Sequence, residues 1–298
     1  MLFTDRVSPC QRVESSLFGR VQLWIKRDDM LHPQVSGNKF RKLKYPLRAL
    51  QGRAPHLVTM GGPWSNHLHA LAHAAALYGY PATALVRGSA GMHSATLDDC
   101  RRLGMQVQFV SRIAYRQLRD DSEQWRLHLA AITERHVWLP EGGSAPSALR
   151  GVAELVGELP FVPDAVVVAS GTGATLAGLV AGMRGRGRLF GVAALKNAGY
   201  LRTEIAALLQ AAGYEDNRNY ELLTDCHCGG YGKTTPALLQ FCAQFSRETG
   251  IALEPVYTGK MLFALQQLAR AGVFSAQEKV LAVHTGGLQG ARGFADFI

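Results

Sequence analysis

A glycine-rich turn joins an apolar run to a helix-like pattern in the second half of the chain. Residues 165–169 are valine and alanine only, and the turn that follows reads Ser170-Gly171-Thr172-Gly173-Ala174-Thr175. Small residues let backbone N–H groups approach an anion, and the positive end of the following helix favours negative charge there. The turn therefore predicts either a phosphate-binding loop or a tight strand-to-helix corner.

Lys39 follows a glycine at the expected start of another helix, in Ser36-Gly37-Asn38-Lys39. A lysine in this position loses hydration and meets the positive end of the helix dipole, and both effects lower the pKa of its amine. A neutral amine is what a carbonyl-binding lysine requires. Most lysines are simply surface residues, but such a lysine together with a phosphate-binding loop suggests pyridoxal phosphate, which needs both.

A third segment of interest also lies between an apolar run and a helical pattern, and it reads Met60-Gly61-Gly62-Pro63-Trp64-Ser65-Asn66-His67. Ser65 and Asn66 are residue types preferred at helix N-caps, which is one interpretation. The same geometry can hold a substrate carboxylate, which is the other.

Two groups of histidine and cysteine invite a metal-site interpretation. His69 and His73 have the i, i+4 spacing of a metal-binding helix, but no acidic third ligand accompanies them. Cys226-His227-Cys228 lacks the second pair of ligands that a zinc site needs. We therefore expect no metal.

The elements that must position these residues alternate along the chain. Expected strands cover residues 21–25, 56–60, 82–86, 106–110, 165–169, 189–194, 222–225 and 279–283. Expected helices cover residues 38–51, 66–78, 94–103, 115–135, 175–183, 201–212, 235–249 and 260–271. This alternation favours an α/β fold with parallel-type twisted sheets flanked by helices. We expect two domains, a large one of residues 1–47 and 143–298 and a small one of residues 48–142 inserted between its two parts.

The composition is that of a globular protein, with 298 residues of which 47% are hydrophobic and 18% charged, and it excludes disordered, collagen-like and coiled-coil classes. The formal charge is +9, but basic and acidic residues are interspersed and no nucleic-acid-binding signature is present, so we expect no nucleic-acid partner. The densest basic cluster suits either a solvated helix face or a small anion, and it comprises Lys39, Arg41, Lys42 and Lys44.

Cysteine usage and hydropathy bear on the compartment. The five cysteines are odd in number and scattered, which favours a reducing compartment, and the first residues show no signal-peptide pattern, so we expect a cytoplasmic protein. The charge-free stretch 165–183 is 19 residues long, which meets the length of a membrane span. Because a glycine turn interrupts it, we interpret it as strand, turn and helix, and expect no membrane partner.

Eight motifs in order along nearly the whole chain resemble the family of 1-aminocyclopropane-1-carboxylate deaminases and D-cysteine desulfhydrases. They are KRDD at 26–29, SGNKFRKLKY at 36–45, GG-x-x-SNH at 61–67, GGS at 142–144, SGTGATLAGL at 170–179, GGYGK at 229–233, EPVYTGK at 254–260 and HTGG at 284–287. The resemblance implies a fold-type II pyridoxal-phosphate enzyme, similar to the tryptophan synthase β subunit, that acts on a small amino acid as a homodimer.

The resemblance also implies a role for each matching residue. Lys39 is similar to the lysine that bonds to pyridoxal phosphate, Asn66 to the asparagine beside the cofactor's phenolic oxygen, and Lys42 to a basic residue near its phosphate. The phosphate loop corresponds to Gly171, Thr172, Gly173, Ala174 and Thr175. The substrate-carboxylate loop corresponds to Ser65 with the backbone amides of Asn66 and His67. The implied catalytic residues are Lys39, Ser65 and a pair of active-site tyrosines, Tyr231 and Tyr257.

Two departures from the family pattern bear on the reaction. Ring-opening deaminases usually carry Glu after the second tyrosine and Leu in the HxGG motif, where this chain has Thr258 and Thr285. The resemblance also makes Thr285 a cofactor-binding residue. The family's Glu can protonate the pyridine nitrogen of the cofactor, whereas a threonine partner leaves that nitrogen neutral and weakens the cofactor as an electron sink. We therefore predict a D-cysteine desulfhydrase-like lyase that performs β-elimination and yields a 2-oxo acid and ammonia. The alternative within the family is a ring-opening deaminase, and Trp64 would reshape the substrate pocket in either case.

Two further classes of protein are weighed against this prediction. A non-catalytic homologue that only binds cofactor or amino acid has no chemical need for Lys39 or for the two tyrosines. A nucleotide-binding α/β protein would need the glycine fingerprint and an acidic ribose partner, and the turn at 170–175 fails the first because Leu176 occupies the third glycine position.

Overall fold

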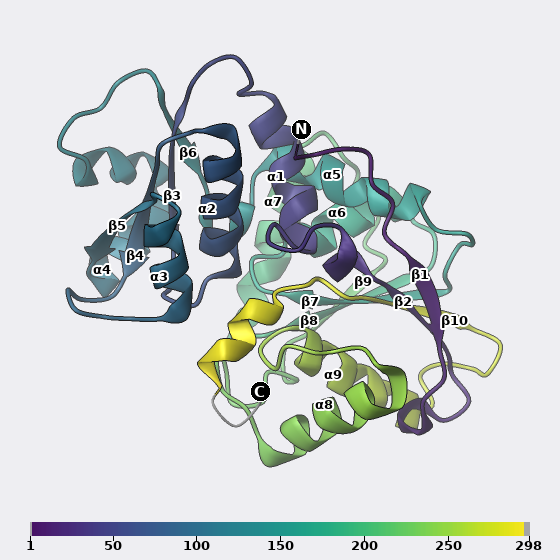
Figure 1. The fold of residues 1–298 in the computed structure, drawn as a ribbon. Helices are drawn as coiled ribbons and strands as arrows, with labels where there is room; N and C mark the ends of the chain where they lie inside the picture. The colour runs from purple at the N-terminus through teal and green to yellow at the C-terminus, as the bar shows by residue number, and fades with distance from the viewer. Residues whose placement is uncertain (1, 295–298) are drawn as a thin grey trace.

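Two β-sheets, each with helices on both faces, organise the structure, a computed structural model that describes residues 2–294 (Figure 1). The larger sheet has the order β1 (Cys10–Val13), β2 (Gln22–Lys26), β10 (Lys279–Val283), β7 (Ala165–Ser170), β8 (Arg188–Ala193) and β9 (Tyr220–Leu223). The smaller sheet has the order β5 (Gln106–Val110), β4 (Ala82–Arg87), β3 (His56–Gly61) and β6 (His136–Leu139). Every pairing is parallel except β1 with β2, so the predicted α/β class is confirmed.

Helices α5 (Pro146–Gly157), α6 (Ala174–Met183) and α7 (Leu201–Ala211) cover one face of the larger sheet, and α8 (Pro236–Thr249) and α9 (Thr258–Arg270) cover the other. The central strand β7 shows why both faces are covered. Val166 and Val168 pack among α5, α6 and α7, while Val167 packs among α8 and α9. Because successive side chains of a strand point to opposite faces, an unbroken apolar run requires a helical layer on each side.

The smaller sheet is built in the same way. Helices α2 (Asn66–Tyr78) and α3 (Ala95–Arg102) cover one face, and α4 (Arg112–Asp120) with the 3-10 segment Ser122–His128 covers the other. Further 3-10 segments lie at Ser16–Phe18, Asp28–Met30, Glu141–Gly143, Ala198–Tyr200 and Leu288–Gly293. None of the helices within residues 2–294 is long and apolar enough to span a bilayer. The stretch 165–183 forms β7, a turn and α6, as its glycine turn predicted.

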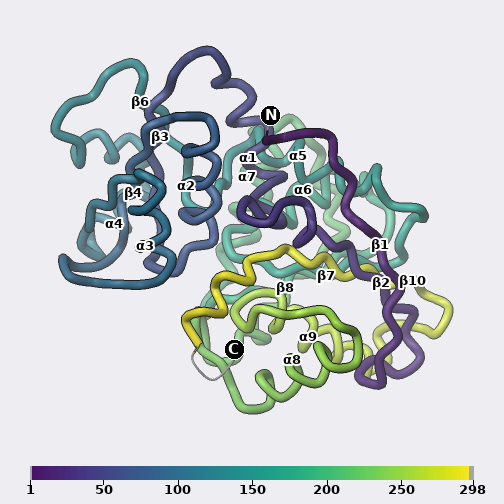
Figure 2. Tube along the Cα trace, viewed as in Figure 1, coloured from purple at the N-terminus to yellow at the C-terminus, as the bar shows by residue number. Residues whose placement is uncertain are grey.

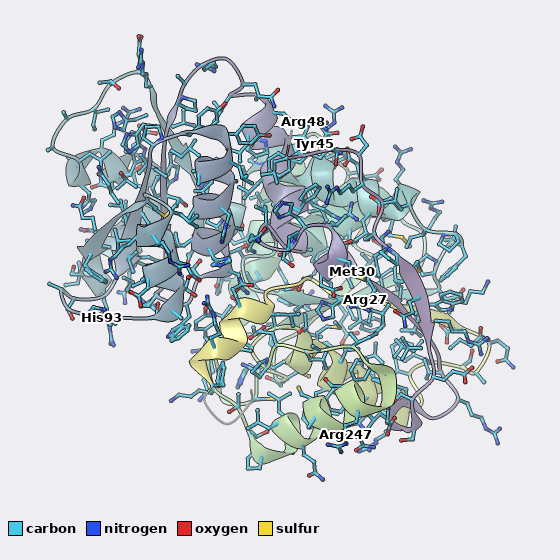
Figure 3. All side chains as sticks on the ribbon, in the orientation of Figure 1. Arg27, Met30, Tyr45, Arg48, His93 and Arg247 are labelled. Atoms are coloured by element: carbon cyan, nitrogen blue, oxygen red, sulfur yellow. The ribbon has the colours of Figure 1, made fainter. Side chains whose placement is uncertain are left out.

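Helix α1 (Asn38–Arg48) lies between the two sheets, as the chain trace shows (Figures 1 and 2). Leu43 and Leu47 belong to the core of the smaller sheet, whereas the other side of the helix packs on α5, where a Cβ at Gly151 would lie 2.1 Å from the Arg41 carbonyl oxygen. At the surface end of α1, Tyr45 and Arg48 lie near the start of the chain (Figure 3). The helix that begins with the Lys39 segment is therefore held by both layers.

A buried group of charges anchors α1 to the larger sheet. Arg41 Nε donates to Asp28 Oδ2 at 2.6 Å, and Arg41 Nη1 donates to Glu158 Oε1 at 2.8 Å. Lys26 Nζ lies 2.6 Å from Glu158 Oε2, and the Lys26 side chain is fully buried. Three of these four residues belong to the KRDD and SGNKFRKLKY motifs, so part of the family resemblance is explained by the attachment of α1 rather than by chemistry.

Several elements differ from the predicted ones. The helix expected over 115–135 ends at Asp120, because the Asp121 side chain accepts from the Glu123 amide and begins a separate 3-10 turn. The helix expected over 38–51 ends at Arg48. Strands β1 and β6 and helix α5 were not predicted at all. The two strands are four residues long and depend on their pairing with β2 and β3, which the sequence does not display.

Candidate active site

A cavity of about 390 Å³ opens where the carboxyl ends of strands from both sheets face each other. Crevices at the carboxyl ends of parallel strands are the usual binding places of α/β folds. All but one of the site residues predicted from the sequence line this cavity: Lys39, Lys42, Ser65, Asn66, His67, Gly171, Thr172, Gly173, Thr175, Tyr231, Tyr257 and Thr285. The exception is Ala174, which is fully buried in the first turn of α6.

Lys39 lies in the first turn of α1 and faces the cavity. The preceding Gly37 has φ +62°, and a Cβ on it would lie 1.8 Å from the Thr285 carbonyl oxygen, so only glycine fits. The Asn38 amide donates to that same oxygen at 3.2 Å, which fixes the start of the helix against the HTGG segment. Burial lowers the pKa of the Lys39 amine from 10.5 to about 8. Lys39 thus has the property predicted from its position, a readily deprotonated amine.

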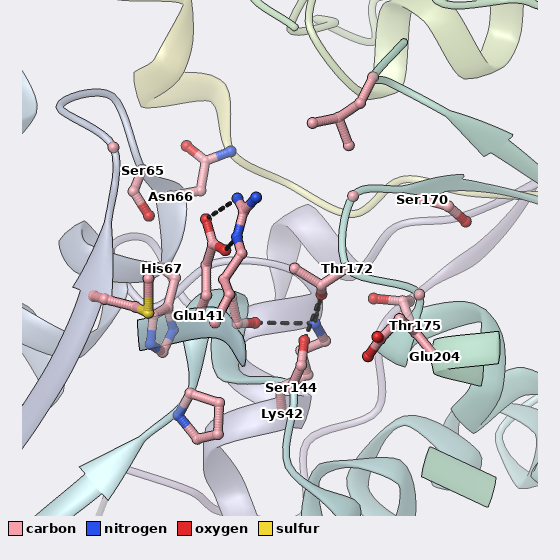
Figure 4. A pocket seen from close by; sticks show the side chains of 18 of the residues that line it. Lys42, Ser65, Asn66, His67, Glu141, Ser144, Ser170, Thr172, Thr175 and Glu204 are labelled. Carbon is pink, nitrogen blue, oxygen red and sulfur yellow. Dashed lines mark hydrogen bonds and ion pairs between the residues drawn. The ribbon is translucent and has the colours of Figure 1, made fainter. Parts of the chain in front are cut away.

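Lys42 lies one turn further along the same face of α1. Its Nζ donates to the Gly142 carbonyl oxygen at 2.9 Å and to Thr172 Oγ1 at 3.4 Å (Figure 4). Burial and, after it, the charge of Lys39 hold the pKa of Lys42 well below its usual value. Within residues 2–294, no carboxylate counters either lysine. Two lysines at one cavity without a carboxylate partner are the electrostatic arrangement of an anion-binding site, because a bound anion would favour their charged forms.

The glycine turn forms the wall opposite these lysines. Gly173 has φ +78° and precedes α6 without any side-chain cap on the helix. The first amides of α6 therefore have no capping acceptor, and the positive end of the helix points into the cavity. A Cβ at Gly173 would lie 2.9 Å from Ile205 Cγ1 on a backbone with φ +78°, which favours glycine there, and one at Gly171 would press on the Tyr257 ring, 3.1 Å from Cε1. Of the two interpretations offered for this turn, its chemistry suits the phosphate-binding loop.

Hydroxyl and amide groups beside the turn are already ordered by neighbours that the sequence analysis did not assign. Asn38 Nδ2 donates to Thr175 Oγ1 at 2.9 Å, and the Ser144 hydroxyl donates to Thr172 Oγ1. Ser170 Oγ is buried without a hydrogen-bond partner among the described residues. The signals were present, since Asn38 directly precedes Lys39 and Ser144 ends the GGS motif, but only the fold brings both residues to the turn.

The loop after β3 contributes the third wall. Ser65 Oγ accepts from the Leu68 amide at 3.3 Å, so Ser65 is the N-cap of α2, as one of its two interpretations predicted. The loop also lines the cavity, as the other interpretation requires. Asn66 Oδ1 accepts from Gln289 Nε2 at 2.7 Å. Gln289 lies far away in the sequence, two residues after the HTGG motif, and was not predicted. It orients the Asn66 side-chain amide so that its nitrogen remains a donor.

His67 has a tautomer fixed by its neighbours. Thr59 Oγ1 donates its only proton to the Leu139 carbonyl oxygen at 2.7 Å, so at 2.9 Å from His67 it must accept from Nε2. The Nδ1 atom of the neutral ring is then an acceptor, and it is buried without a partner among the described residues. Burial and the charges of Lys39 and Lys42 keep the pKa of His67 well below its usual value.

Tyr231 and Tyr257 both line the cavity and meet there, with ring centroids 6.1 Å apart and planes at 67°. Burial raises the pKa of both phenols, that of Tyr257 well above its usual value, and the neighbouring tyrosine raises it further. Both hydroxyls are therefore protonated at neutral pH and can donate a proton or a hydrogen bond.

The two threonines that distinguish this chain from ring-opening deaminases occupy different surroundings. Thr285 lines the cavity. Thr258 is fully buried outside it, where its hydroxyl donates to the Glu254 carbonyl oxygen at 3.1 Å and accepts from the Glu254 amide at 2.9 Å. Only Thr285 of the pair is therefore available to a ligand in the cavity.

Among the described residues, two carboxylates line the cavity, those of Glu141 and Glu204. Glu141 accepts from Arg119 Nε at 2.6 Å and from the Tyr115 hydroxyl at 2.5 Å, so it is neutralised by its own neighbours (Figure 4). Among residues 2–294, no group of three or more His, Cys, Asp or Glu is arranged to hold a metal ion. His69 Nε2 instead lies 3.4 Å from Asp99 Oδ2.

Taken together, the cavity combines a low-pKa lysine, a phosphate-compatible helix start with an unpaired lysine beside it, and a second helix start that can take a carboxylate. Ser170 Oγ, which can donate, and His67 Nδ1, an acceptor, are buried beside the cavity without a hydrogen-bond partner among the described residues. This donor set fits pyridoxal phosphate, whose aldehyde needs an amine and whose phosphate needs the helix start.

Comparison with known proteins agrees with this chemistry. A family model described as pyridoxal-phosphate dependent enzyme matches residues 3–286. A D-cysteine desulfhydrase of Yersinia pestis is 32% identical over 295 residues, covering 92% of this chain and 88% of that protein. A Pyrococcus horikoshii protein named provisionally as a 1-aminocyclopropane-1-carboxylate deaminase is 32% identical over 285 residues, covering 92% and 87%. The solved structure of a homologue of that deaminase superimposes with a TM-score of 0.85 at 29% identity, covering 99% of this chain and 94% of that one.

Proposed function

Because the chain belongs to the family of pyridoxal-phosphate dependent enzymes, we propose that it is a lyase that removes a leaving group from the β-carbon of a small amino acid, as a D-cysteine desulfhydrase does. Pyridoxal phosphate is the cofactor of this family. The observation that carries the proposal is the pair of buried, carboxylate-free lysines, Lys39 and Lys42, facing the uncapped start of α6.

The residues that would hold the cofactor follow from their donors. Lys39 would bond its aldehyde, and the amides of the turn and of the start of α6, from Gly171 to Thr175, would bind its phosphate with Lys42 nearby. Asn66, oriented by Gln289, would donate to its phenolic oxygen, and the Thr285 hydroxyl would serve its ring nitrogen. When bound, the cofactor withdraws electrons from the α-carbon of the substrate.

The N-terminus of α2 would hold the substrate carboxylate. The backbone amides of Asn66 and His67 lie at the positive end of that helix beside the Ser65 side chain, and all three residues line the cavity. Burial and the charges of Lys39 and Lys42 keep the pKa of His67 well below its usual value, so a neutral ring would leave binding of the carboxylate to the backbone amides.

Lys39 and Tyr257 would move the protons. Once released by the incoming amine, Lys39 Nζ would take the proton from the α-carbon, which its pKa of about 8 allows near neutral pH. The bond from the β-carbon to the leaving group then breaks, and the protonated Tyr257 hydroxyl would donate a proton to the departing thiolate. Addition of water to the unsaturated product gives the 2-oxo acid and ammonia.

Elimination is favoured over ring opening by the surroundings of Thr285. Within the described residues lining the cavity, the carboxylates are Glu141 and Glu204, and Glu141 is engaged by Arg119 and Tyr115. With a threonine as the partner, the ring nitrogen stays neutral, which suffices for loss of a good leaving group but weakens the stabilisation that cleavage of a cyclopropane requires.

The test is release of a 2-oxo acid by the purified protein supplied with pyridoxal phosphate. D-cysteine should yield pyruvate, 1-aminocyclopropane-1-carboxylate should yield nothing, and Lys39→Ala should abolish both turnover and the bound chromophore. Oxobutanoate from the cyclopropane would instead establish the ring-opening deaminase. Full activity of the Lys39→Ala protein would refute the assignment of either reaction to this cavity.

We further propose a homodimer in the cytoplasm, with residues 48–142 as the small domain. The dimer is supported by the family resemblance. The compartment is supported by the five cysteines, all of which are free thiols, as expected in a reducing environment. The domain division is supported by the smaller sheet, whose strands all fall between His56 and Leu139.

A further inference from the structure

One fully buried carboxylate beside the cavity has no part in the mechanism above. Glu254 precedes α9 and is 1% exposed. Its Oε1 accepts from the Val256 amide at 2.5 Å and its Oε2 accepts from the Tyr257 amide at 2.9 Å. Helix α9 has no cap from its N-cap residue, Tyr257, so the Glu254 carboxylate takes two of the backbone donors that lie at its start.

These two bonds determine where the Tyr257 backbone lies. The turn is tightened further because the Gly259 amide donates to the Glu254 carbonyl oxygen at 2.8 Å and the Thr258 hydroxyl bonds both the amide and the carbonyl of Glu254. From that backbone the Tyr257 ring extends over the phosphate-binding turn and contacts Gly171, where a Cβ would lie 3.1 Å from Tyr257 Cε1. A displaced backbone would move the phenol relative to the turn.

We propose that Glu254 is a positioning residue for Tyr257, whose ionised carboxylate grips the Val256 and Tyr257 amides and so directs the phenol to the reacting atoms in the cavity. The inference rests on the proposed function, in which Tyr257 protonates the leaving group. Glu254 itself does not touch the cavity.

The two hydrogen bonds from the Val256 and Tyr257 amides depend on the charge of Glu254, because a carboxylate accepts from two amides more strongly than a carboxylic acid does. The groups whose charges interact with Glu254 are Lys260 and Tyr257 of the α9 segment, Tyr231 of the facing loop and Cys242 of α8. The 3-10 segment Leu288–Gly293 packs on it through Gly290, which is uncharged. Lys260 is the only cation of this set, and its Nζ donates to the Gly230 carbonyl oxygen at 2.8 Å rather than to Glu254.

This environment places the titration of Glu254 near neutral pH. Burial raises the pKa of its carboxyl to about 7, against the opposing effect of the two amide bonds and the Lys260 charge. The ionised form therefore predominates at pH 8 and falls to roughly a tenth at pH 6. The hydrogen bonds that hold the Tyr257 backbone should therefore weaken as the pH falls through about 7.

Kinetics of the holoenzyme test the role. Glu254→Gln keeps the shape but turns one amide donor toward an N–H group, so kcat should fall at least about tenfold while KM changes less than about twofold. The decline of kcat centred near pH 7 should disappear in this variant. Glu254→Asp keeps the charge, so it should retain part of kcat and also the decline of kcat near pH 7. Glu278→Gln is the matched control, because Glu278 accepts from the Ser275 amide at 2.6 Å at the surface, outside the cavity lining.

A second measurement does not depend on turnover. With 3-fluorotyrosine placed at position 257 of the holoenzyme, the fluorine resonance should show an inflection near pH 7 in the wild type. It should persist in Glu278→Gln and vanish in Glu254→Gln. If no amino acid yields a 2-oxo acid, the proposed function fails. The inflection would still test whether the ionised Glu254 carboxylate positions Tyr257. A flat fluorine titration in the wild type, or unchanged kcat in Glu254→Gln, would overturn the inference.

Discussion

Replacing Lys39 by methionine should stabilise the cofactor-free protein at neutral pH. Burial lowers the pKa of the Lys39 amine from 10.5 to about 8, so the folded protein binds this proton less tightly than the unfolded chain does. The difference of 2.5 pKa units corresponds to about 3 kcal/mol lost from the free energy of unfolding at pH 7. Part of the side chain opens into the cavity, which water can reach, so this is an upper value.

The sign of the pH dependence distinguishes this effect from packing. A group whose folded pKa is lowered destabilises the fold while it is protonated, so the penalty is full below about pH 8 and disappears as the pH rises toward 10.5. The stability difference between Lys39→Met and wild type should therefore be largest at pH 7 and shrink toward pH 10. A packing effect would be the same at both values.

Urea unfolding of the cofactor-free proteins at pH 7, 8.5 and 10 would measure this difference directly. Lys233→Met serves as the control, since Lys233 is exposed and its replacement should change the free energy of unfolding by less than about 0.5 kcal/mol. A Lys39→Met protein that is less stable than wild type at pH 7, or whose stability difference does not depend on pH, would refute the reasoning that burial makes this amine available.

Three further predictions concern the tyrosine, the anchor of α1 and the glycine turn. Tyr257→Phe should keep the absorbance of the bound cofactor but lower kcat by about 10² or more, since a proton donor is lost; unchanged kinetics would remove Tyr257 from the mechanism. Arg41→Ala should lower the free energy of unfolding by about 3–5 kcal/mol, measured in denaturant, because Asp28 and Glu158 would remain buried without their partner; a loss below about 1 kcal/mol would contradict this. Gly173→Ala should weaken binding in a pyridoxal-phosphate titration, because φ +78° and the Ile205 contact both resist a Cβ; wild-type affinity would show that the turn does not hold the phosphate.

The predicted gain in stability on removal of Lys39 indicates that the binding site lowers the stability of the cofactor-free protein. A site that keeps two lysines buried beside an uncapped helix start is unfavourable for the empty fold. The same groups become favourable when an anionic cofactor binds them, so cofactor binding and stability are linked.

The sequence alone determined the features that depend on neighbouring residues. Alternating apolar runs and helical patterns predicted the α/β class, since the periods of strands and helices are properties of local chain geometry. The glycine at 37, the turn at 170–175 and the loop at 61–67 predicted three helix starts that could bind a lysine-bound aldehyde, a phosphate and a carboxylate. Each of these motifs contains its own turn and its own helix start, so each can be predicted from its local sequence without the rest of the chain.

Only the tertiary structure decided which residues complete the site. Gln289 orients Asn66, Ser144 and Asn38 order the two threonines of the turn, and Glu254 holds the Tyr257 backbone from outside the cavity. Both Thr258 and Thr285 enter the reaction predicted from the sequence, whereas the fold buries Thr258 against Glu254 and leaves Thr285 facing the cavity. The reason is physical: hydrogen-bond partners and burial depend on distances between segments that are remote in sequence, and those distances are set by how two sheets pack around α1.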